Sequence, residues 1–319
     1  MAVVLVFVDG VGIGSHGVEW NPLNRGPFLL SHFSDGSGTP LPQGGHVARV
    51  DATLGVEGRP QSATGQATLY TGVNAPAALG RHLVGFPNAA LRALIERHSL
   101  FLQLANLGAR ATLANALPAP YLEFLGMPYA GPRVESFAMP ERRRRHLKPP
   151  AGVLAAAPLG PLRTIDDARA GRALTHDITG GARHRHRAEV PFRKPTDAAH
   201  ILLGLAQEHD FVLFEHFLLD EAGHDQELAL PVLEDLDAFL RAVVDGLAPS
   251  DHLLVVSDHG NLEDLSTRCH TRNPVPLLAF GRRAAEICSG ARSIADVAPW
   301  VCELTRPAAR PRGASVARA

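Results

Sequence analysis

Three short apolar runs in this chain of 319 residues each deliver an acidic side chain at their end or shortly after it. The runs have the length and composition of buried strands, and they alternate with segments whose apolar residues repeat about every 3.6 positions. The expected strands are residues 3–8, 211–214, 253–256 and 276–280, and the expected helices are residues 91–107, 196–208, 231–247 and 293–304. This alternation predicts a doubly wound α/β fold with a largely parallel sheet and helices on both of its faces.

The acidic residues that follow these strands are Asp9, Asp220 and Asp258. In an open α/β sheet the carboxyl ends of parallel strands meet at one edge, and binding sites form there. Acidic residues placed by chance would be more scattered. We therefore expect the three carboxylates to gather at one edge of the sheet.

The overall composition excludes recognition that depends on a strong charge. The chain has 31 basic and 32 acidic residues and a formal net charge of −1, so we expect neither a nucleic acid nor a membrane as partner. Three cysteines are too few for a disulfide framework and favour a reducing compartment, the cytoplasm.

The apolar N-terminal run is interrupted by Asp9 and is too short for a signal peptide or a membrane span.

The middle of the chain differs in composition from the segments on either side. Residues 116–193 are rich in proline, glycine and arginine and have weak periodicity, although apolar residues recur throughout. We interpret this segment as a small inserted cap on a discontinuous core formed by residues 1–115 and 194–306. Residues 307–319 have the composition of a disordered tail.

Residues 257–276, SDHGNLEDLSTRCHTRNPVP, join two expected strands and concentrate side chains that can bind metal ions. These side chains are Asp258, His259, Glu263, Asp264 and His270. A solvated polar loop is the alternative, but the position between two buried strands favours a site. The segment DEAGH begins at Asp220 and ends at His224, and these two side chains converge on one ion if the segment is one helical turn.

Two further segments offer an oxygen ligand or a nucleophile. In VFVDGVGIG, residues 6–14, glycine-rich backbone follows Asp9 and would leave its carboxylate exposed; an aspartate that only caps the loop is the alternative. In GRPQSATGQATLYTG, residues 58–72, Ser62 lies at or near a helix N-terminus, where free N–H groups and the helix dipole favour an anion. Ser62 could instead be only an N-cap residue, and Thr64 is the competing hydroxyl.

Together these segments supply three carboxylates, three imidazoles and one hydroxyl. They are Asp9, Ser62, Asp220, His224, Asp258, His259 and His270. Mixed nitrogen and oxygen ligands suit Zn²⁺ or Mn²⁺, and the set is too large for one ion but suits two. Two such ions can hold the attacking and the leaving oxygen of a displacement at phosphorus, so we expect two divalent metal ions per chain.

The order of these motifs resembles the alkaline phosphatase superfamily, and most closely its branch of cofactor-independent phosphoglycerate mutase and phosphopentomutase. SDHGNLED and HTRNPVP are similar to that branch's DHGN and HTxNPVP motifs, and the resemblance covers about residues 1–110 and 195–305. It implies an alkaline phosphatase-like core with Ser62 as the phosphorylated nucleophile. It also implies one metal ion on Asp9, Ser62, Asp258 and His259, and a second on Asp220, His224 and His270.

Two departures from that branch bear on function. PQSATGQ stands where the mutases have a segment similar to NSEVGH, with differences at Ala63, Thr64 and Gln66, so Thr64 remains an alternative nucleophile. The inserted segment is also shorter than the cap with which the mutases hold and reorient their substrate. A short cap would seal the site less well against water, which favours a hydrolase.

The resemblance implies phosphoryl transfer from a small phosphorylated substrate. Ser62 would attack the phosphate ester, and water or a second substrate hydroxyl would then take the phosphoryl group. A phosphomutase is the first alternative, and a catalytically inactive protein that binds metal and phosphate is the second. The expected substrate contacts are Arg183, Arg185, Arg187 and Arg272. A guanidinium suits bidentate contact with phosphate, although a solvated surface would explain the first three arginines equally.

Overall fold

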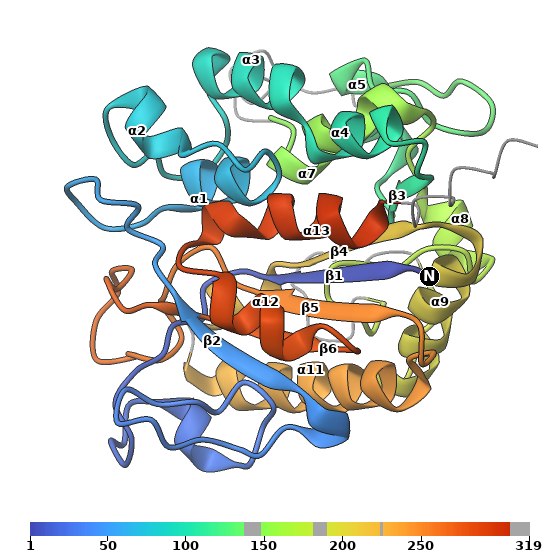
Figure 1. The fold of residues 1–319 in the computed structure, drawn as a ribbon. Coiled ribbons are helices and arrows are strands. Elements are labelled where there is room, and N and C mark those ends of the chain that lie inside the picture. The colour runs from blue at the N-terminus through green and yellow to red at the C-terminus, as the bar shows by residue number, and fades with distance from the viewer. Residues whose placement is uncertain (137–147, 181–189, 224–225, 307–319) are drawn as a thin grey trace, which may run out of the picture.

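The computed structural model describes residues 1–136, 148–180, 190–223 and 226–306. Within these residues the chain forms a six-stranded sheet in the order β2-β6-β5-β1-β4-β3 (Figure 1). The strands are β1 (Val3–Val8), β2 (His46–Val50), β3 (Ala111–Leu113), β4 (Phe211–His216), β5 (His252–Val256) and β6 (Val275–Phe280). The predicted fold class, an open α/β sheet with helices on both faces, is confirmed. β2 and β3 were not predicted from the sequence.

The direction of β6 decides where the chain leading into it lies. β1 is parallel to β5 on one side and to β4 on the other, and β4 is parallel to β3 as well. β6, by contrast, is antiparallel to both β5 and β2. The sheet is therefore mixed, and β6 begins at the edge where β1, β4 and β5 end. As a result, residues 257–274, which connect β5 to β6, lie along that edge and do not cross the sheet.

Alternate side chains of β1 point to opposite faces of the sheet, and each face has its own apolar core. Leu5 and Phe7 pack in the first core, and Val4 and Val6 pack in the second; all four are buried. The first core is covered by α1 (Ser62–Leu69), α3 (Ala89–His98), α4 (Leu100–Asn106), α7 (Ala151–Ala156), α12 (Ala284–Gly290) and α13 (Val297–Thr305). The second core is covered by α9 (Pro195–Glu208), α10 (Leu218–Ala222) and α11 (Gln226–Gly246). Figure 1 shows α11 on the side of the sheet opposite to α13.

The helix expected over residues 91–107 is two helices that meet at Ser99. The backbone of Ser99 is not helical, and its hydroxyl oxygen accepts a hydrogen bond from the backbone N–H of Phe101, the second residue of α4. The same hydroxyl donates to the carbonyl of Ala155 in α7 over 2.7 Å. Because α3 and α4 face the same core, their apolar residues keep a helical spacing across the break, and the spacing alone does not reveal it.

The described part of residues 116–193 packs against the rest of the chain through α7. Val153 and Leu154 belong to the same apolar core as Leu5 and Phe7. The shorter helices and 3₁₀ turns are α2 (Ala75–Leu79), α5 (Ala119–Leu125), α8 (Ile165–Arg169), Pro22–Arg25, Pro42–Gly44, Ala157–Leu159 and Ile294–Asp296. The division into a core of residues 1–115 and 194–306 and an inserted cap stays a prediction. Among the described residues, no helix has the length and apolar character needed to span a membrane.

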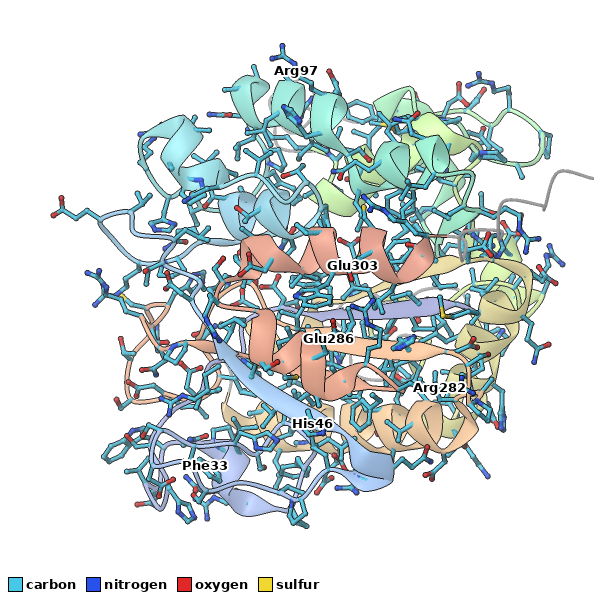
Figure 2. The ribbon with its side chains drawn as sticks, viewed as in Figure 1. Phe33, His46, Arg97, Arg282, Glu286 and Glu303 are labelled. Carbon is cyan, nitrogen blue, oxygen red and sulfur yellow. The ribbon has the colours of Figure 1, made fainter. Side chains whose placement is uncertain are left out.

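Surface ion pairs tie α12, which carries Glu286, to α13, which carries Glu303; both glutamates are labelled in Figure 2. The guanidinium of Arg283 donates to the carboxylate of Glu286 on α12 over 2.6 Å and to that of Glu303 on α13 over 2.6 Å. Glu286 and Glu303 are largely exposed, so solvent screens their interactions with Arg283 and these contribute little to stability.

Candidate metal centre

Four segments meet at the edge of the sheet where β1, β4 and β5 end. They are the turn after β1, the first residue of α1, helix α10 and the loop from β5 to β6. They bring together Asp9, Ser62, Asp220, Asp258, His259 and His270. His224, the remaining predicted ligand, lies outside the described residues.

The first group of ligands is built around the imidazole of His259. Its Nε2 atom lies 3.0 Å from Oγ of Ser62, 3.2 Å from Oδ1 of Asp9 and 3.7 Å from Oδ1 of Asp258. One ligand atom from each of Asp9, Asp258 and His259 lies within 4.8 Å of the others, and all three residues are buried. A single ring nitrogen cannot hydrogen-bond to three oxygens at once, whereas nitrogen and oxygen atoms gathered in this way are suited to surround a cation.

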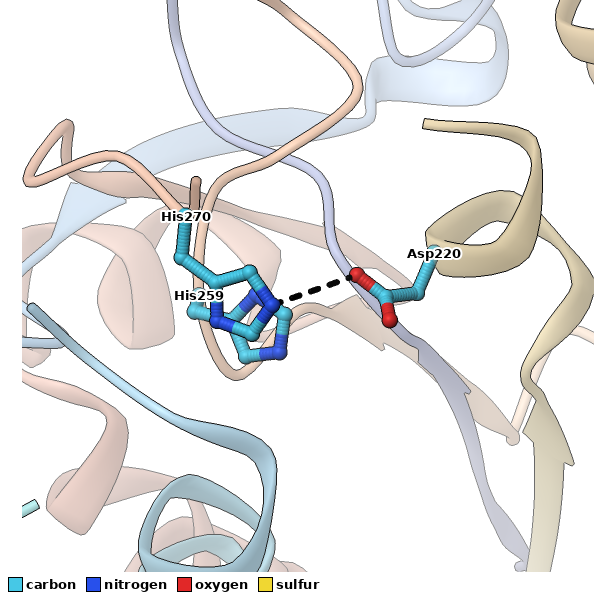
Figure 3. A group of neighbouring side chains, drawn as sticks. All are labelled: Asp220, His259 and His270. Carbon is cyan, nitrogen blue, oxygen red and sulfur yellow. Dashed lines mark ion pairs between the residues drawn. The ribbon is translucent and has the colours of Figure 1, made fainter. Parts of the chain in front are cut away.

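The second group lies next to the first and shares His259 with it (Figure 3). Nε2 of His270 is 3.7 Å from Oδ1 of Asp220, and the rings of His259 and His270 stack with centroids 3.7 Å apart. Nδ1 of His270 is 3.1 Å from the carbonyl oxygen of Pro60, two residues before Ser62. If Nδ1 carries the proton and donates it to that carbonyl, the lone pair of Nε2 is directed toward Asp220, as in a metal-binding histidine.

The electrostatics of the first group are those of a site that lacks positive charge. Burial and the neighbouring Asp258 raise the pKa of Asp9 well above its ordinary value, and burial likewise raises the pKa of Asp258. Burial alone would lower the pKa of His259, but Asp258 and Asp9 outweigh it and raise that pKa to about 10. Within the described part of the chain, Oδ1 of Asp9 is a buried oxygen without a hydrogen-bond partner. A divalent cation would satisfy this oxygen and relieve the repulsion between the carboxylates, so the residues fit a metal site.

Two amide side chains that the sequence analysis did not single out as site residues hold the carboxylates in place. Nε2 of Gln66 donates to Oδ2 of Asp9 over 3.4 Å and to Oδ2 of Asp258 over 3.3 Å. Nδ2 of Asn261 donates to Oδ1 of Asp220 over 2.7 Å. Asn261 belongs to the DHGN motif, so its proximity was a signal for a role at the site. Gln66 was visible only as a departure from the mutase pattern.

The glycine-rich turn after Asp9 does not leave that carboxylate exposed, as the sequence analysis expected. Asp9 is 6% exposed, because the loop after β5 and the start of α10 close over the turn. Gly10 has a φ of +74°, and a Cβ atom there would lie 2.7 Å from Oδ1 of Asp220. Glycine is therefore needed for the close approach of the Asp220 carboxylate, and not for exposure of Asp9.

The two candidate hydroxyls occupy different environments. Ser62 is the first residue of α1, with Gln61 at the N-cap position, and its Oγ faces His259. The hydroxyl of Thr64 donates to the carbonyl of Gln61 over 3.2 Å and accepts from the backbone N–H of Leu83 over 3.2 Å. Thr64 is thus engaged with the backbone on either side of it, whereas Ser62 faces the ligand groups.

The predicted substrate-binding arginines are only partly described. Arg272 is exposed in the loop from β5 to β6, two residues after His270. Arg183, Arg185 and Arg187 lie outside the described residues. Glu263, another acidic residue of this loop, is buried and turns to the backbone and to Thr271 rather than to the imidazoles.

Sequence comparisons match only part of the chain. The model of the Metalloenzyme superfamily matches residues 192–307. The 2,3-bisphosphoglycerate-independent phosphoglycerate mutase of Desulforudis audaxviator is 34% identical over 125 residues, which are 36% of this chain and 24% of that protein. The protein of the same name from Pseudomonas fluorescens is 32% identical over 108 residues, or 31% of this chain and 21% of that protein. The match thus spans less than a quarter of the length of these relatives.

Structural comparisons extend over nearly the whole chain. The alkaline phosphatase from the Antarctic bacterium TAB5 superposes with a TM-score of 0.54 at 12% identity, covering 95% of this chain and 98% of that one. The PH0037 protein from Pyrococcus horikoshii superposes with a TM-score of 0.52 at 16% identity, covering 98% of both chains. At these identities the likeness demonstrates a shared fold.

Proposed function

We propose that this chain, which resembles metalloenzymes of the alkaline phosphatase superfamily, is a two-metal-dependent phosphoryl-transfer enzyme. Its substrate is a small phosphate ester, and its reaction runs through a phosphorylated Ser62. The observation that carries the proposal is the distance of 3.0 Å between Oγ of Ser62 and Nε2 of His259, amid buried carboxylates at the sheet edge. A hydroxyl in that position shares its surroundings with the metal ligands.

The proposed ligands divide into two sets. One ion would be held by Asp9, Ser62, Asp258 and His259, and the other by Asp220, His224 and His270. Bound divalent ions, which we propose to be Mn²⁺ or Zn²⁺, would neutralise charge on the transferring group and lower the pKa of a hydroxyl. Gln66 and Asn261 orient the carboxylates through their amide N–H groups.

Ser62 carries the covalent chemistry in this proposal. Its Oγ loses its proton to solvent and forms a bond to phosphorus, while the bond from phosphorus to the leaving oxygen breaks and the leaving alcohol takes a proton from water. Because Ser62 opens α1, the positive end of the helix dipole lies at the developing negative charge. Water then attacks the phosphoserine, inorganic phosphate leaves, and Ser62 regains a proton.

We favour hydrolysis over isomerisation because the inserted segment is short. Residues 116–193 offer less chain for enclosing a substrate than the cap expected of a mutase, so water reaches the phosphoserine more easily. A phosphomutase is the second candidate, and the named phosphoglycerate mutases among the relatives favour it. A protein that binds metal and phosphate without turnover is the third, although the six described ligand positions all retain ligand side chains.

Further parts of the proposal concern the substrate and the setting. Arg272, together with Arg183, Arg185 and Arg187 of the insertion, would contact the substrate phosphate by bidentate hydrogen bonds. Residues 116–193 would act as a cap on the metal-binding core, and the enzyme would work in the cytoplasm. The partner is a small phosphorylated molecule rather than a nucleic acid or a membrane.

The test is metal content measured together with turnover of a panel of phosphate esters and phosphosugars, for the wild type and Ser62→Ala. We expect two metal ions per chain, release of inorganic phosphate, and loss of turnover in Ser62→Ala. An isomerised phosphosugar or phosphoglycerate as product would select the mutase. A protein that binds no metal after reconstitution would overturn the whole assignment. Full activity of Ser62→Ala would move the nucleophile to Thr64 or to water.

A further inference from the structure

Glu263 places a buried carboxylate at the junction of the turn after β1 and the loop from β5 to β6, two segments that carry candidate ligand groups. One carboxylate oxygen, Oε2, accepts hydrogen bonds from the backbone N–H of Gly12 over 2.8 Å and from that of Asn261 over 2.9 Å. The other oxygen, Oε1, accepts from the Thr271 hydroxyl and from Nδ2 of Asn273 over 3.0 Å. Glu263 is 1% exposed. Oε2 therefore binds backbone N–H groups, and Oε1 binds side chains next to His270.

The backbone around Glu263 is shaped to receive this carboxylate. A Cβ atom at Gly12 would lie 2.2 Å from Oε1 of Glu263, and one at Gly260 would also lie 2.2 Å from it. A Cβ atom at Gly14 would lie 2.8 Å from Cγ. Three glycines from two segments thus leave room for one side chain, which accounts for the second and third glycines of the DGVGIG segment.

The segments that Glu263 joins each hold one part of the metal centre. Gly12 lies three residues after Asp9, and the amide of Asn261 binds the Asp220 carboxylate. Thr271 directly follows His270, and its backbone N–H donates to the carbonyl of Gly260 over 2.9 Å. All four donors to Glu263 are neutral, and they occupy both of its oxygens. Glu263 is therefore arranged to fix the backbone and not to bind a cation itself.

We propose that Glu263 is a positioning residue that sets the spacing between the two groups of metal ligands. It ties Thr271, the residue after His270, to the turn after Asp9, so that the imidazole of His270 stays stacked on that of His259. This inference rests on the proposed function, because it presumes that both groups hold metal ions. It goes beyond that function in assigning a role to an acidic residue that is not a ligand.

Two substitutions at Glu263 distinguish the effect of side-chain length from the effect of the negative charge. In Glu263→Gln the amide oxygen still accepts from Gly12 and Asn261, and the amide nitrogen donates to the hydroxyl of Thr271 and, once its side-chain amide turns over, to Asn273. In Glu263→Asp the charge stays, but the side chain is one methylene shorter and cannot serve both sides. Positioning therefore predicts that Gln is the tolerated replacement and Asp the harmful one.

The experiment titrates metal-free protein with Mn²⁺ by calorimetry and records the EPR spectrum of the Mn²⁺-loaded protein, which reports the spacing of the two ions. We expect two binding steps in wild type and Glu263→Gln. In Glu263→Asp the weaker step should lose about 10- to 100-fold in affinity, as is typical when a residue that supports a ligand is changed. Thr271→Val, which removes one donor while the carboxylate stays, should weaken the same step. Glu286→Asp, the same change at an exposed position, is the matched control.

Several outcomes would overturn the inference. Wild-type affinity in both Glu263→Asp and Thr271→Val would show that the spacing does not depend on Glu263. Loss of metal in Glu263→Gln with retention in Glu263→Asp would show that the charge matters instead. If Glu263→Asp does not fold, as judged by its thermal unfolding, Thr271→Val decides alone. A wild type without metal would overturn the proposed function as well, so failure of the function is distinguishable from failure of this inference.

Discussion

The hydroxyl oxygen of Ser62 lies 3.0 Å from Nε2 of His259, although 197 positions separate the two residues in the chain. The contact joins the N-terminus of α1 to the end of β5, across the edge of the sheet. It is a place where a hydroxyl, an imidazole and two buried carboxylates share a small volume.

The phosphorylated intermediate should be found on Ser62. After brief exposure to a substrate of the panel and quenching in acid, intact mass measurement should detect one added phosphoryl group, and peptide mapping should place it on Ser62. Thr64→Val should still form the adduct, because the Thr64 hydroxyl contacts backbone and not His259. A phosphoryl group on Thr64 would contradict the assignment.

Gly10→Ala should damage the metal centre, whereas Gly36→Ala should only lower stability. Both glycines have positive φ, +74° and +87°, so alanine costs about 1–2 kcal/mol of unfolding free energy at either position. Only at Gly10 would the new Cβ meet Asp220; at Gly36 no atom outside the adjoining residues would lie within 4 Å of it. Urea unfolding compared with Mn²⁺ titration separates the two effects. Equal metal affinity in both variants would argue against a role for Asp220.

Gln66→Leu should destabilise the metal-free protein more than the metal-loaded one. Its amide donates to the carboxylates of Asp9 and Asp258, so leucine leaves both without that donor at a cost of about 1–3 kcal/mol. A bound cation would compensate those carboxylates and reduce the loss. Gln103→Leu is the control, because Gln103 donates to the carbonyls of Thr71 and His98. Thermal unfolding with and without Mn²⁺ should show a metal-dependent difference for Gln66→Leu alone; an equal loss under both conditions would contradict the role of Gln66.

Glu215 should make the protein less stable as the pH rises from 5 to 8. Burial raises the pKa of this carboxyl on β4 to about 7, and its Oε1 accepts a hydrogen bond from the hydroxyl of Tyr70 over 2.8 Å. The folded protein therefore holds a proton that the unfolded chain has already released. The favourable contribution is complete below the unfolded pKa and is lost as the pH passes the folded pKa, a change of about 3 kcal/mol.

The measurement is urea unfolding of wild type and Glu215→Gln at several pH values, with a chelator present so that metal binding does not contribute. Gln keeps an acceptor for Tyr70 but does not titrate, so the advantage of Glu215→Gln over wild type should grow with pH. Glu286→Gln, at an exposed carboxylate whose pKa is lowered by hydrogen bonds from Arg283, should show no such trend. Parallel pH profiles for wild type and Glu215→Gln would count against this assignment.

The parts of the fold that could be predicted are those in which local pattern and burial agree. β1 was predicted with the bounds that it has, because all six of its residues are buried and apolar. β2 was missed because it is an edge strand with only Ala48 and Val50 buried, and β3 because three residues give no pattern. The single helix expected over residues 91–107 was wrong at Ser99, where a hydrogen bond from the hydroxyl to α7 depends on tertiary structure.

In the candidate site, too, the features set by local sequence could be predicted and those set by tertiary contacts could not. The strand-end positions of Asp9 and Asp258 place them at one edge without any knowledge of side-chain contacts. By contrast, the sequence does not distinguish Glu263 from the acidic residues that face the imidazoles, because its role depends on three glycines that come close only in the folded chain. The exposure expected for Asp9 was wrong for a related reason: local glycines suggested an open turn, and distant segments cover it.

The reversed direction of β6 has a consequence for how this site can diversify. Asp258 and His270 stand near opposite ends of a connection whose two anchors, β5 and β6, are hydrogen-bonded neighbours. Both ends are thus fixed by the sheet, and the Gly260–Thr271 bridge closes the base of the connection. Residues 264–269 between them can change in length or sequence at little entropic cost, while Asp258 and His270 keep their places. The candidate site can therefore tolerate variation in the middle of the loop that carries two of its side chains.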